Sequence, residues 1–264
     1  MSKVVVITGG TSGIGLQAGR FLAERGCVVY ELSRRPEGTD PRLHHIQTDM
    51  TDESQVQNAV QKILHREGRI DVLVNNAGFG ISGAVEFTET KDAERQFDVN
   101  FFGMVRMNKA VIPIMRKQGS GRIISMSSVA APIAIPFQTY YSASKAAIRT
   151  YMLALAPEIR PYGIETCTIM PGDIHTGFTS ARKKSPAGDD VYGGRISRSV
   201  AVMEHDELNG ITSEAAGAFV ARKVLQRRVP LLCTLGWKYK IFVFLTRIIS
   251  TRVMTWIVGQ IYAK

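Results

Sequence analysis

The stretch VVVITGGTSGIG, from Val4 to Gly15, constrains the fold of this chain more than any other part of it. Four branched apolar residues lead into a cluster of Gly, Thr and Ser, and no charged side chain occurs in these twelve residues. Such a pattern is typical of a buried strand that ends in a glycine-rich turn. Glycine permits the tight turn and lets a ligand approach the backbone without a Cβ in the way.

The rest of the chain alternates strand-like apolar runs with helical stretches. Strands are predicted at 4–8, 28–33, 45–49, 71–75, 122–127 and 165–170, and helices at 14–25, 53–66, 91–117 (either continuous or broken) and 139–160. The strand runs show little polar alternation, which indicates a sheet covered on both faces. We therefore expect an α/β fold, doubly wound around a mostly parallel sheet with right-handed crossovers. A length of 264 residues suits one such domain and is short for two.

The opening turn is followed directly by a predicted helix. The first N–H groups of a helix and the positive end of its dipole attract anions. In this strand–turn–helix context the glycines predict a site for the pyrophosphate of a dinucleotide. The alternative is a glycine-rich turn with no ligand.

The charge and cysteine content narrow the classes of protein. The net charge is +10, yet residues 227–264 hold seven Lys or Arg and no acidic residue, while the rest holds 26 basic and 23 acidic residues. The basic character thus belongs to the tail and does not predict nucleic-acid binding. Three distant cysteines form neither a disulfide framework nor a metal site, so we expect a reducing cytoplasm and no metal. We expect no signal peptide before the first strand.

Six motifs occur in an order that resembles the short-chain dehydrogenase/reductase family, over a region from Lys3 to about Thr179. They are TGGTSGIG at Thr8 to Gly15, NNAG at Asn75 to Gly78, Asn100 in FDVNFFG, SMSSVAA at Ser125 to Ala131, YSASK at Tyr141 to Lys145, and PG at Pro171 to Gly172. The resemblance implies a single Rossmann domain, hydride transfer with a nicotinamide cofactor, and a homodimer or homotetramer formed through two long helices. The stretches around residues 75–87 and 97–113, together with the tail, resemble its 17β-hydroxysteroid dehydrogenase-like branch.

The YSASK motif carries the predicted chemistry. Tyr141 and Lys145 are four residues apart and share one face of the predicted helix. A tyrosine with a pKa near ~10 is a poor base at neutral pH, and a nearby ammonium lowers that pKa. Such a pair suits proton transfer to a carbonyl oxygen. The alternative is an ordinary surface pair of tyrosine and lysine.

Two further catalytic positions follow from the resemblance. Ser128 lies thirteen residues before Tyr141, at the family's interval for the serine that holds the substrate oxygen. Ser127 competes for this role, and both serines could instead end the strand. Asn100 matches the residue that positions a water against the lysine, although it could also satisfy backbone groups at a helix break.

The cofactor is predicted from the sequence VVYELSRRPE. An acidic residue after the second strand binds the ribose of NAD, whereas arginine suits the 2′-phosphate of NADP. In the family's register Ser33 takes the acidic position and Arg34 and Arg35 follow, which predicts NADP(H) over NAD(H). Glu31 would be an acidic ligand only if the strand were shifted by two residues. The other expected cofactor contacts are Gly9, Thr11, Ser12, Gly13, Ile14 and Gly15 at the phosphates, Asp49, Met50, Asn75, Asn76, Ala77 and Gly78 at the adenosine side, and Tyr141, Lys145, Pro171, Gly172, Ile174 and Thr176 toward the nicotinamide.

The substrate side is predicted from two segments. Residues 173–210 lack strong periodicity and are interpreted as a substrate loop or lid, or as a mobile surface loop. The apolar segment Ala131 to Phe137, with Phe79 and Ile81, favours a lipophilic substrate over a sugar, although such residues are also ordinary packing.

The tail, residues 236–264, is apolar and basic and lies outside the predicted nucleotide-binding domain at 1–235. Two arginines interrupt residues 241–262, which argues against a membrane-spanning helix. A continuous helix would align Phe242, Leu245, Ile249, Val253 and Trp256 on one stripe. The tail is interpreted first as helices packed over the substrate pocket, and otherwise as an interfacial membrane helix or a subunit contact.

These observations predict an NADP(H)-dependent oxidoreductase that interconverts a secondary alcohol and a ketone on a lipophilic, hydroxysteroid-like substrate, with Tyr141 as acid/base. One alternative is a 3-oxoacyl-thioester reductase whose basic tail meets an acidic acyl carrier. Another is a non-catalytic module that senses NADPH. The four predicted catalytic residues argue against a sensor, which needs no proton donor.

Overall fold

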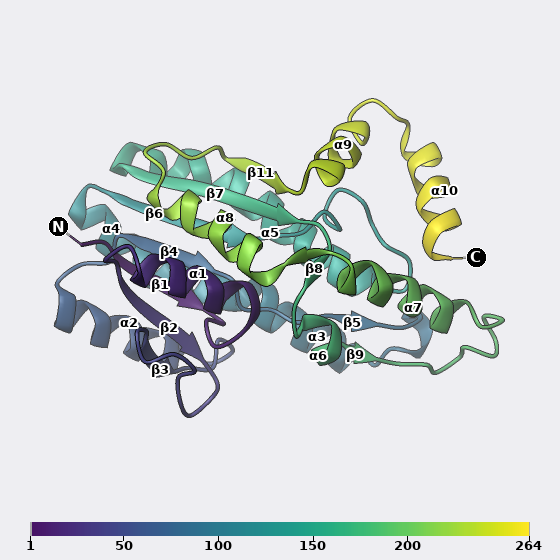
Figure 1. Ribbon diagram of the computed structural model, residues 1–264, viewed down its shortest axis with the longest axis horizontal. Helices are drawn as coiled ribbons and strands as arrows, with labels where there is room; N and C mark the ends of the chain where they lie inside the picture. The colour runs from purple at the N-terminus through teal and green to yellow at the C-terminus, as the bar shows by residue number, and fades with distance from the viewer. Residues whose placement is uncertain (1, 264) are drawn as a thin grey trace.

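The computed structural model describes residues 2–263 and has a seven-stranded sheet at its centre, with the strand order β11-β7-β6-β4-β1-β2-β3 (Figure 1). Every pairing in this sheet is parallel, as predicted. The strands are β1 (Val4–Thr8), β2 (Val28–Ser33), β3 (His44–Gln47), β4 (Val72–Asn75), β6 (Gly121–Met126), β7 (Ile164–Pro171) and β11 (Leu232–Leu235). The order reverses direction between β1 and β4, and open α/β sheets bind ligands beside such a point.

Helices cover both faces of the sheet. They are α1 (Gly13–Ala23), α2 (Glu53–Glu67), α3 (Thr90–Phe97), α4 (Gly103–Gln118), α5 (Thr139–Ile159), α6 (Phe178–Ala181), α7 (Arg195–Leu208), α8 (Ser213–Leu225), α9 (Trp237–Leu245) and α10 (Thr251–Tyr262). The core under α2, α4 and α5 is separate from the core under α1 and α8. Alternation along β1 explains this, because Val4 and Val6 enter the first core whereas Val5 and Ile7 enter the second. Full burial of such a side chain contributes about 1.5–3 kcal/mol.

The predicted helix at 91–117 is broken. A π-helical turn, Asp98–Phe102, separates α3 from α4, and the buried Asn100 lies within it. Turns of this kind inside helices often occur at functional sites.

Residues 173–210 contain more regular structure than their sequence indicated. They form β8 (Ile174–His175), α6, β9 (Lys183–Lys184) and α7, and the short strands pair with β10 (Ile211–Thr212) and β5 (Ile81–Ser82). Elements of two to four residues are too short to produce a hydrophobic period. Helix α7 buries only Ile196, Ser199 and Met203 of its fourteen residues, so its pattern is weak as well.

The tail forms two helices, so the prediction of an apolar stripe along one continuous helix is wrong. Helix α9 ends at Leu245, and the side chain of Ser250 accepts the Val253 N–H and caps the start of α10. Helix α9 contacts β11, and α10 contacts α7. In Figure 1 both helices lie at the edge of the molecule beyond β11. Among the described residues, no helix is long and apolar enough to cross a membrane.

Candidate active site

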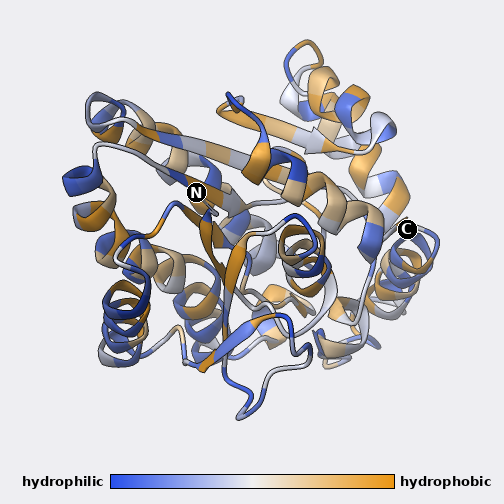
Figure 2. Ribbon diagram, turned by 60° about the vertical axis from the view of Figure 1, so that its left-hand side comes forward, coloured by the Kyte–Doolittle hydropathy of each residue, from blue (hydrophilic) through white to orange (hydrophobic). Residues whose placement is uncertain are grey.

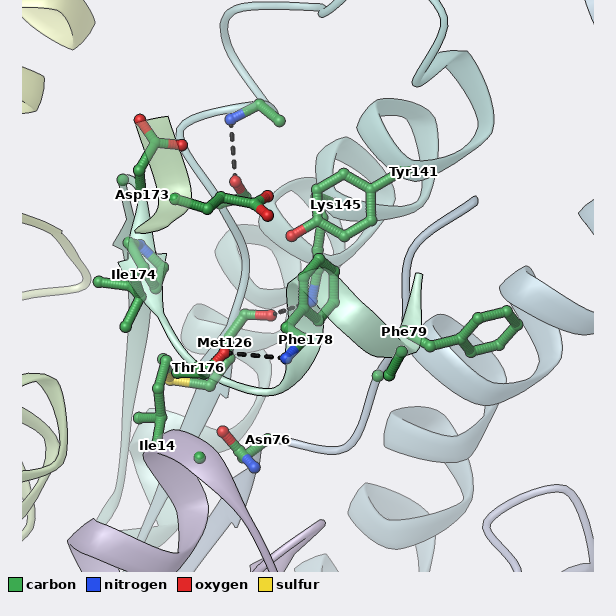
Figure 3. A pocket seen from close by; sticks show the side chains of 18 of the residues that line it. Ile14, Asn76, Phe79, Met126, Tyr141, Lys145, Asp173, Ile174, Thr176 and Phe178 are labelled. Carbon is green, nitrogen blue, oxygen red and sulfur yellow. Dashed lines mark hydrogen bonds between the residues drawn. The ribbon is translucent and has the colours of Figure 1, made fainter. Parts of the chain in front are cut away.

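A cavity of about 280 Å³ lies at the carboxyl ends of the central strands. The structure brings most of the predicted site residues into its wall, and Figure 3 shows several of them. The predicted residues that line it are Gly9, Thr11, Ser12, Gly13, Ile14, Asn76, Ala77, Gly78, Ser128, Tyr141, Lys145, Pro171, Gly172, Ile174 and Thr176. The carboxyl ends of parallel strands meet at one edge of the sheet, which explains why distant motifs converge there.

The glycine turn after β1 is closely fitted to the loop after β4. Gly9 has a φ of +67°, and a Cβ there would lie 3.0 Å from the Cα of Ala77. The Thr8 hydroxyl accepts the N–H groups of Asn76 and Ala77, both at 3.0 Å. The Asn76 amide in turn donates to the carbonyl oxygens of Thr8 and Gly9. Glycine therefore allows the conformation of the turn, and hydrogen bonds to the loop after β4 fix its position.

This turn also fits a phosphate group. Gly13 has a φ of +52° and starts α1, and no acidic side chain occupies residues 13–16. The side chain of Ser12, the residue before α1, makes no capping bond, so it does not compete for the first N–H groups of the helix. A ligand anion can accept from those groups. The residues present thus fit the phosphates of a dinucleotide.

Gly15, by contrast, makes room within the protein. A Cβ there would lie 2.6 Å from the Asn76 amide nitrogen and from the Gly9 carbonyl oxygen. It allows α1 to pack against the turn and does not line the cavity.

Tyr141 and Lys145 project from the same face of α5 into the cavity, as predicted (Figure 3). The Lys145 ammonium lies 5.6 Å from the centre of the Tyr141 ring and donates to the Met126 carbonyl oxygen at 2.9 Å. The Tyr141 ring also packs against Phe178, with ring centres 5.6 Å apart.

The expected lowering of the tyrosine pKa is not found. Burial raises the pKa of Tyr141 to about 12, against an opposing effect of the Ser128 hydroxyl. Burial also lowers the pKa of Lys145 to about 8. Both side chains lose their hydration on burial, which disfavours the charged form of each. This loss of hydration sets the direction of both pKa shifts. The phenol is therefore fully protonated near pH 7.

The two candidate serines have different roles. The Ser127 hydroxyl donates to the main-chain carbonyl of Lys145 at 2.7 Å and ties β6 to α5. The Ser128 hydroxyl accepts from the Ala130 N–H at 3.1 Å and interacts with the phenol of Tyr141. Only Ser128 therefore directs its hydroxyl toward the tyrosine, which favours Ser128 as the residue that contacts a substrate oxygen.

Asn100 is committed to the protein's own backbone. Its amide oxygen accepts the N–H of Phe79 at 2.9 Å, and its amide nitrogen donates to the Phe79 carbonyl at 3.0 Å. The nitrogen also lies 3.3 Å from the Ser144 hydroxyl. These bonds join the π-helical turn to the loop after β4. The water-positioning role stays a prediction.

Of the residues predicted for the adenosine side and the ribose, Asn76, Ala77 and Gly78 line this cavity, whereas those that follow β2 and β3 lie apart from it. Ser33 ends β2, and its hydroxyl is buried and unpaired among the described residues. Arg34 and Asp49 line a separate groove together with residues of α3. Arg35 is exposed, and Met50 is buried against Gly103. The sequence placed these residues at the ends of β2 and β3 but did not place them relative to one another.

Ser33 is the last residue of β2, and its assignment to the family's acidic position stays a prediction. Glu31 is paired with Ile7 of β1 and lies two residues inside the strand. Its carboxylate contacts the His45 ring at 2.5 Å, and burial raises the pKa of Glu31. One carboxylate oxygen is thus engaged within the protein, and the other is buried without a partner among the described residues.

Several residues that line the cavity carried no sequence signal. Met203 and Glu207 come from α7, and Tyr262 comes from α10. The tail therefore contributes to the cavity wall. Phe178 of α6 and Gln138 before α5 also line it.

A buried ion pair fixes this side of the cavity. The Arg182 side chain is entirely buried and pairs with the Glu207 carboxylate, which also accepts from the Thr179 hydroxyl at 2.6 Å. The guanidinium lies over the Phe178 ring, 5.7 Å from its centre. These contacts hold α6 against α7. The charge of Glu207 acts to raise the pKa of Tyr141, and the charge of Arg182 acts to lower it.

Comparison with known proteins identifies close similarity to one family. Residues 3–187 match the family model described as short chain dehydrogenase. The 3-ketodihydrosphingosine reductase of Bacteroides thetaiotaomicron is 39% identical over 236 residues, which are 89% of this chain and 88% of that protein. The dehydrogenase/reductase SDR family member 7B of Xenopus tropicalis is 34% identical over 87% of this chain and 76% of its own. A short-chain dehydrogenase structure from Streptomyces avermitilis superposes with a TM-score of 0.81 at 28% identity, covering 94% of this chain and 93% of that one.

Proposed function

We propose that this chain, a member of the short-chain dehydrogenase family, uses NADP(H) to interconvert a ketone and a secondary alcohol on a lipophilic substrate. The family assignment makes it an oxidoreductase acting on carbonyl or hydroxyl groups. The single observation that carries this proposal is the convergence of Ser128, Tyr141 and Lys145 in one cavity with the glycine turn.

The cofactor of this family is a nicotinamide dinucleotide, which supplies or accepts hydride when bound. In this chain the glycine turn and the start of α1 would hold its phosphates. Support for NADP(H) over NAD(H) comes from Arg34 and Arg35, two exposed guanidinium groups that directly follow β2, where an acidic side chain would favour NAD.

The chain's own residues would perform the proton chemistry. The Ser128 hydroxyl would donate a hydrogen bond to the substrate oxygen as negative charge develops on it. Tyr141 is protonated at neutral pH because burial raises its pKa to about 12, so its phenol can give a proton to that oxygen.

The cavity wall supports a lipophilic substrate. Ile135, Phe178 and Met203 contribute apolar side chains beside the catalytic tyrosine. A relative that matches almost the whole chain is named for reducing 3-ketodihydrosphingosine. We propose this lipid ketone as the first substrate to test, and hydroxysteroid-like ketones as the second.

The test is NADPH oxidation followed by absorbance with these ketones, with a 3-oxoacyl carrier thioester as a competing substrate class. Tyr141→Phe should lower turnover by about 10²–10⁴-fold while NADPH binding persists. Tyr140→Phe is the matched control, because Tyr140 is the neighbouring residue of α5 and lines the separate groove instead. Unchanged turnover in Tyr141→Phe would refute the catalytic assignment. Faster turnover of the thioester than of any free ketone would refute the substrate class.

We further propose that the protein works as a homodimer or homotetramer in a reducing compartment. The two long helices α4 and α5 offer a surface for self-association, with Leu153 exposed on α5. The buried Cys167 and the partly buried Cys233 have sulfur atoms 3.8 Å apart and remain unlinked thiols. Light scattering measures the oligomeric state, and a monomeric mass would contradict the first part.

A further inference from the structure

The outer face of α9 carries an apolar stripe that the fold does not cover. Trp237, Ile241, Phe244 and Ile248 are 70%, 51%, 59% and 65% exposed. They recur at intervals of four, three and four residues, so they share one side of the helix and of the turn that follows it. Isolated exposed apolar residues are ordinary, but a contiguous set marks a contact surface.

Helix α10 extends this apolar surface. Trp256 and Val253 lie three residues apart and are 64% and 46% exposed. Both tryptophans of the chain therefore stand exposed on the two tail helices. Figure 2 shows apolar residues interspersed with hydrophilic ones along these helices. Tryptophan is favoured where an apolar medium meets water, because its ring is apolar and its N–H is polar.

The inner faces of the same helices are already occupied. The Tyr239 hydroxyl donates to Asp173 at 2.5 Å, and its ring fills the space over Gly172. Val258 is buried, and Tyr262 lines the cavity. The tail therefore cannot turn its outer stripe inward without giving up these contacts.

The charged residues within the tail have a single sign, and the acidic residues Asp173 and Asp206 of other elements contact its inner face through the hydroxyls of Tyr239 and Tyr262. Lys238, Lys240, Arg247 and Arg252 are exposed on the tail helices, and no acidic residue occurs from 227 to the end of the chain. A second copy of this chain would place the same positive charges against each other. An apolar stripe edged only by basic groups is complementary to a surface that is apolar inside and negative outside.

We propose that residues 236–263, here called the tail surface, dock the protein on an anionic lipid bilayer. The stripe enters the boundary between headgroups and acyl chains, and the lysines and arginines contact lipid phosphates. The helices lie in the plane of the interface rather than across it. This binding is separate from the oxidoreductase activity and does not depend on the identity of the substrate.

The test is flotation of the full-length protein with vesicles of phosphatidylcholine, with and without an equal part of phosphatidylglycerol. Binding to the anionic vesicles should be at least about tenfold stronger, and 1 M salt should weaken it, since salt shortens the Debye length to about 3 Å. Tryptophan emission should shift to shorter wavelength with the anionic vesicles, because Trp237 and Trp256 are the only tryptophans.

Two variants separate the parts of the tail surface. Trp237→Ser with Ile241→Ser and Phe244→Ser should reduce vesicle binding at least about tenfold. Lys238→Gln with Lys240→Gln should remove most of the preference for anionic lipid. Val85→Ser with Val191→Ser is the matched control, because these valines are 49% and 70% exposed away from the tail.

All variants should keep their thermal unfolding midpoint and their NADPH oxidation with a short soluble ketone, since the substituted side chains are exposed. The proposal is overturned if the unchanged protein does not bind anionic vesicles, or if the triple serine variant floats as well as the unchanged protein. It is also overturned if light scattering shows that the triple variant dissociates an oligomer, because the stripe would then be a contact between copies.

Discussion

Replacing Lys145 with methionine should stabilise the ligand-free protein while abolishing its turnover. The side chain is buried, and burial lowers the pKa of Lys145 from 10.5 to about 8. At about 1.4 kcal/mol per pKa unit, holding the charge in this place costs about 3 kcal/mol. Methionine fills a similar volume without charge but leaves the Met126 carbonyl without its hydrogen bond, which offsets about 1 kcal/mol. The expected net gain near pH 7 is about 2 kcal/mol.

The pH dependence of this gain distinguishes desolvation from other causes. Between about pH 8 and 10.5 the lysine is deprotonated in the folded protein but still protonated in the unfolded chain. The unfolded state then binds more protons, so the stability of the unchanged protein rises with pH. The advantage of the variant should therefore shrink over this range and reverse by about 1 kcal/mol at its upper end.

The assay is urea unfolding of both proteins at several pH values from about 7 to about 10.5, taking the difference in free energy of unfolding at each. Other groups titrate equally in both proteins and cancel in this difference. Lys62→Met on the exposed side of α2 is the control and should show no pH-dependent difference. A Lys145→Met protein that is less stable near pH 7, or a gap that stays constant with pH, would refute the reasoning.

Three further predictions follow from hydrogen bonds and charges at the site. Ser128→Ala should lower kcat about 10²-fold. Ser127→Ala should leave kcat nearly unchanged. Each variant loses one main-chain hydrogen bond, at 3.1 Å to Ala130 or at 2.7 Å to Lys145, and should cost about 1 kcal/mol of stability. Equal effects of the two substitutions on kcat would contradict this assignment. Replacing Arg34 and Arg35 with alanine should raise KM for NADPH about tenfold and leave KM for NADH unchanged, which initial-rate measurements with each cofactor would check. Asn100→Ala removes two hydrogen bonds to the loop after β4 and should lower the free energy of unfolding in urea by about 2–3 kcal/mol. A smaller decrease than that caused by Ser127→Ala would argue against a structural role of Asn100.

The sheet and the cofactor turn could be predicted because their determinants are local. Apolar runs without alternation specify buried parallel strands, and several of the motifs stand at the carboxyl ends of these strands. Gly9 follows β1, Asn76 follows β4, and Ser128 follows β6. Parallel strands end at a common edge, so residues more than fifty positions apart meet without any further information. The helical spacing of Tyr141 and Lys145 placed this pair in the same way.

The electrostatics of the site could not be predicted, because burial is set by residues that carry no motif. Tyr262 and Glu207 reach the cavity from α10 and α7, far along the chain from the catalytic tyrosine. The sequence joins Tyr141 with Lys145 but does not reveal that both lose their water. The break in the tail had one local signal, Ser250, which is a good residue for starting a helix. The apolar run on both sides of it concealed that signal.

The ion pair between Arg182 and Glu207 has a consequence for how the cavity opens. Its guanidinium is fully enclosed, and the carboxylate is nearly so. A small displacement would separate the two charges without admitting enough water to hydrate them. This arrangement is expected to have a higher free energy than the closed ion pair or two fully hydrated charges. Intermediate positions of α6 and α7 are therefore disfavoured. We therefore expect the cavity on this side to have two states. In one, α6 and α7 are in contact, and in the other they are far enough apart to admit water.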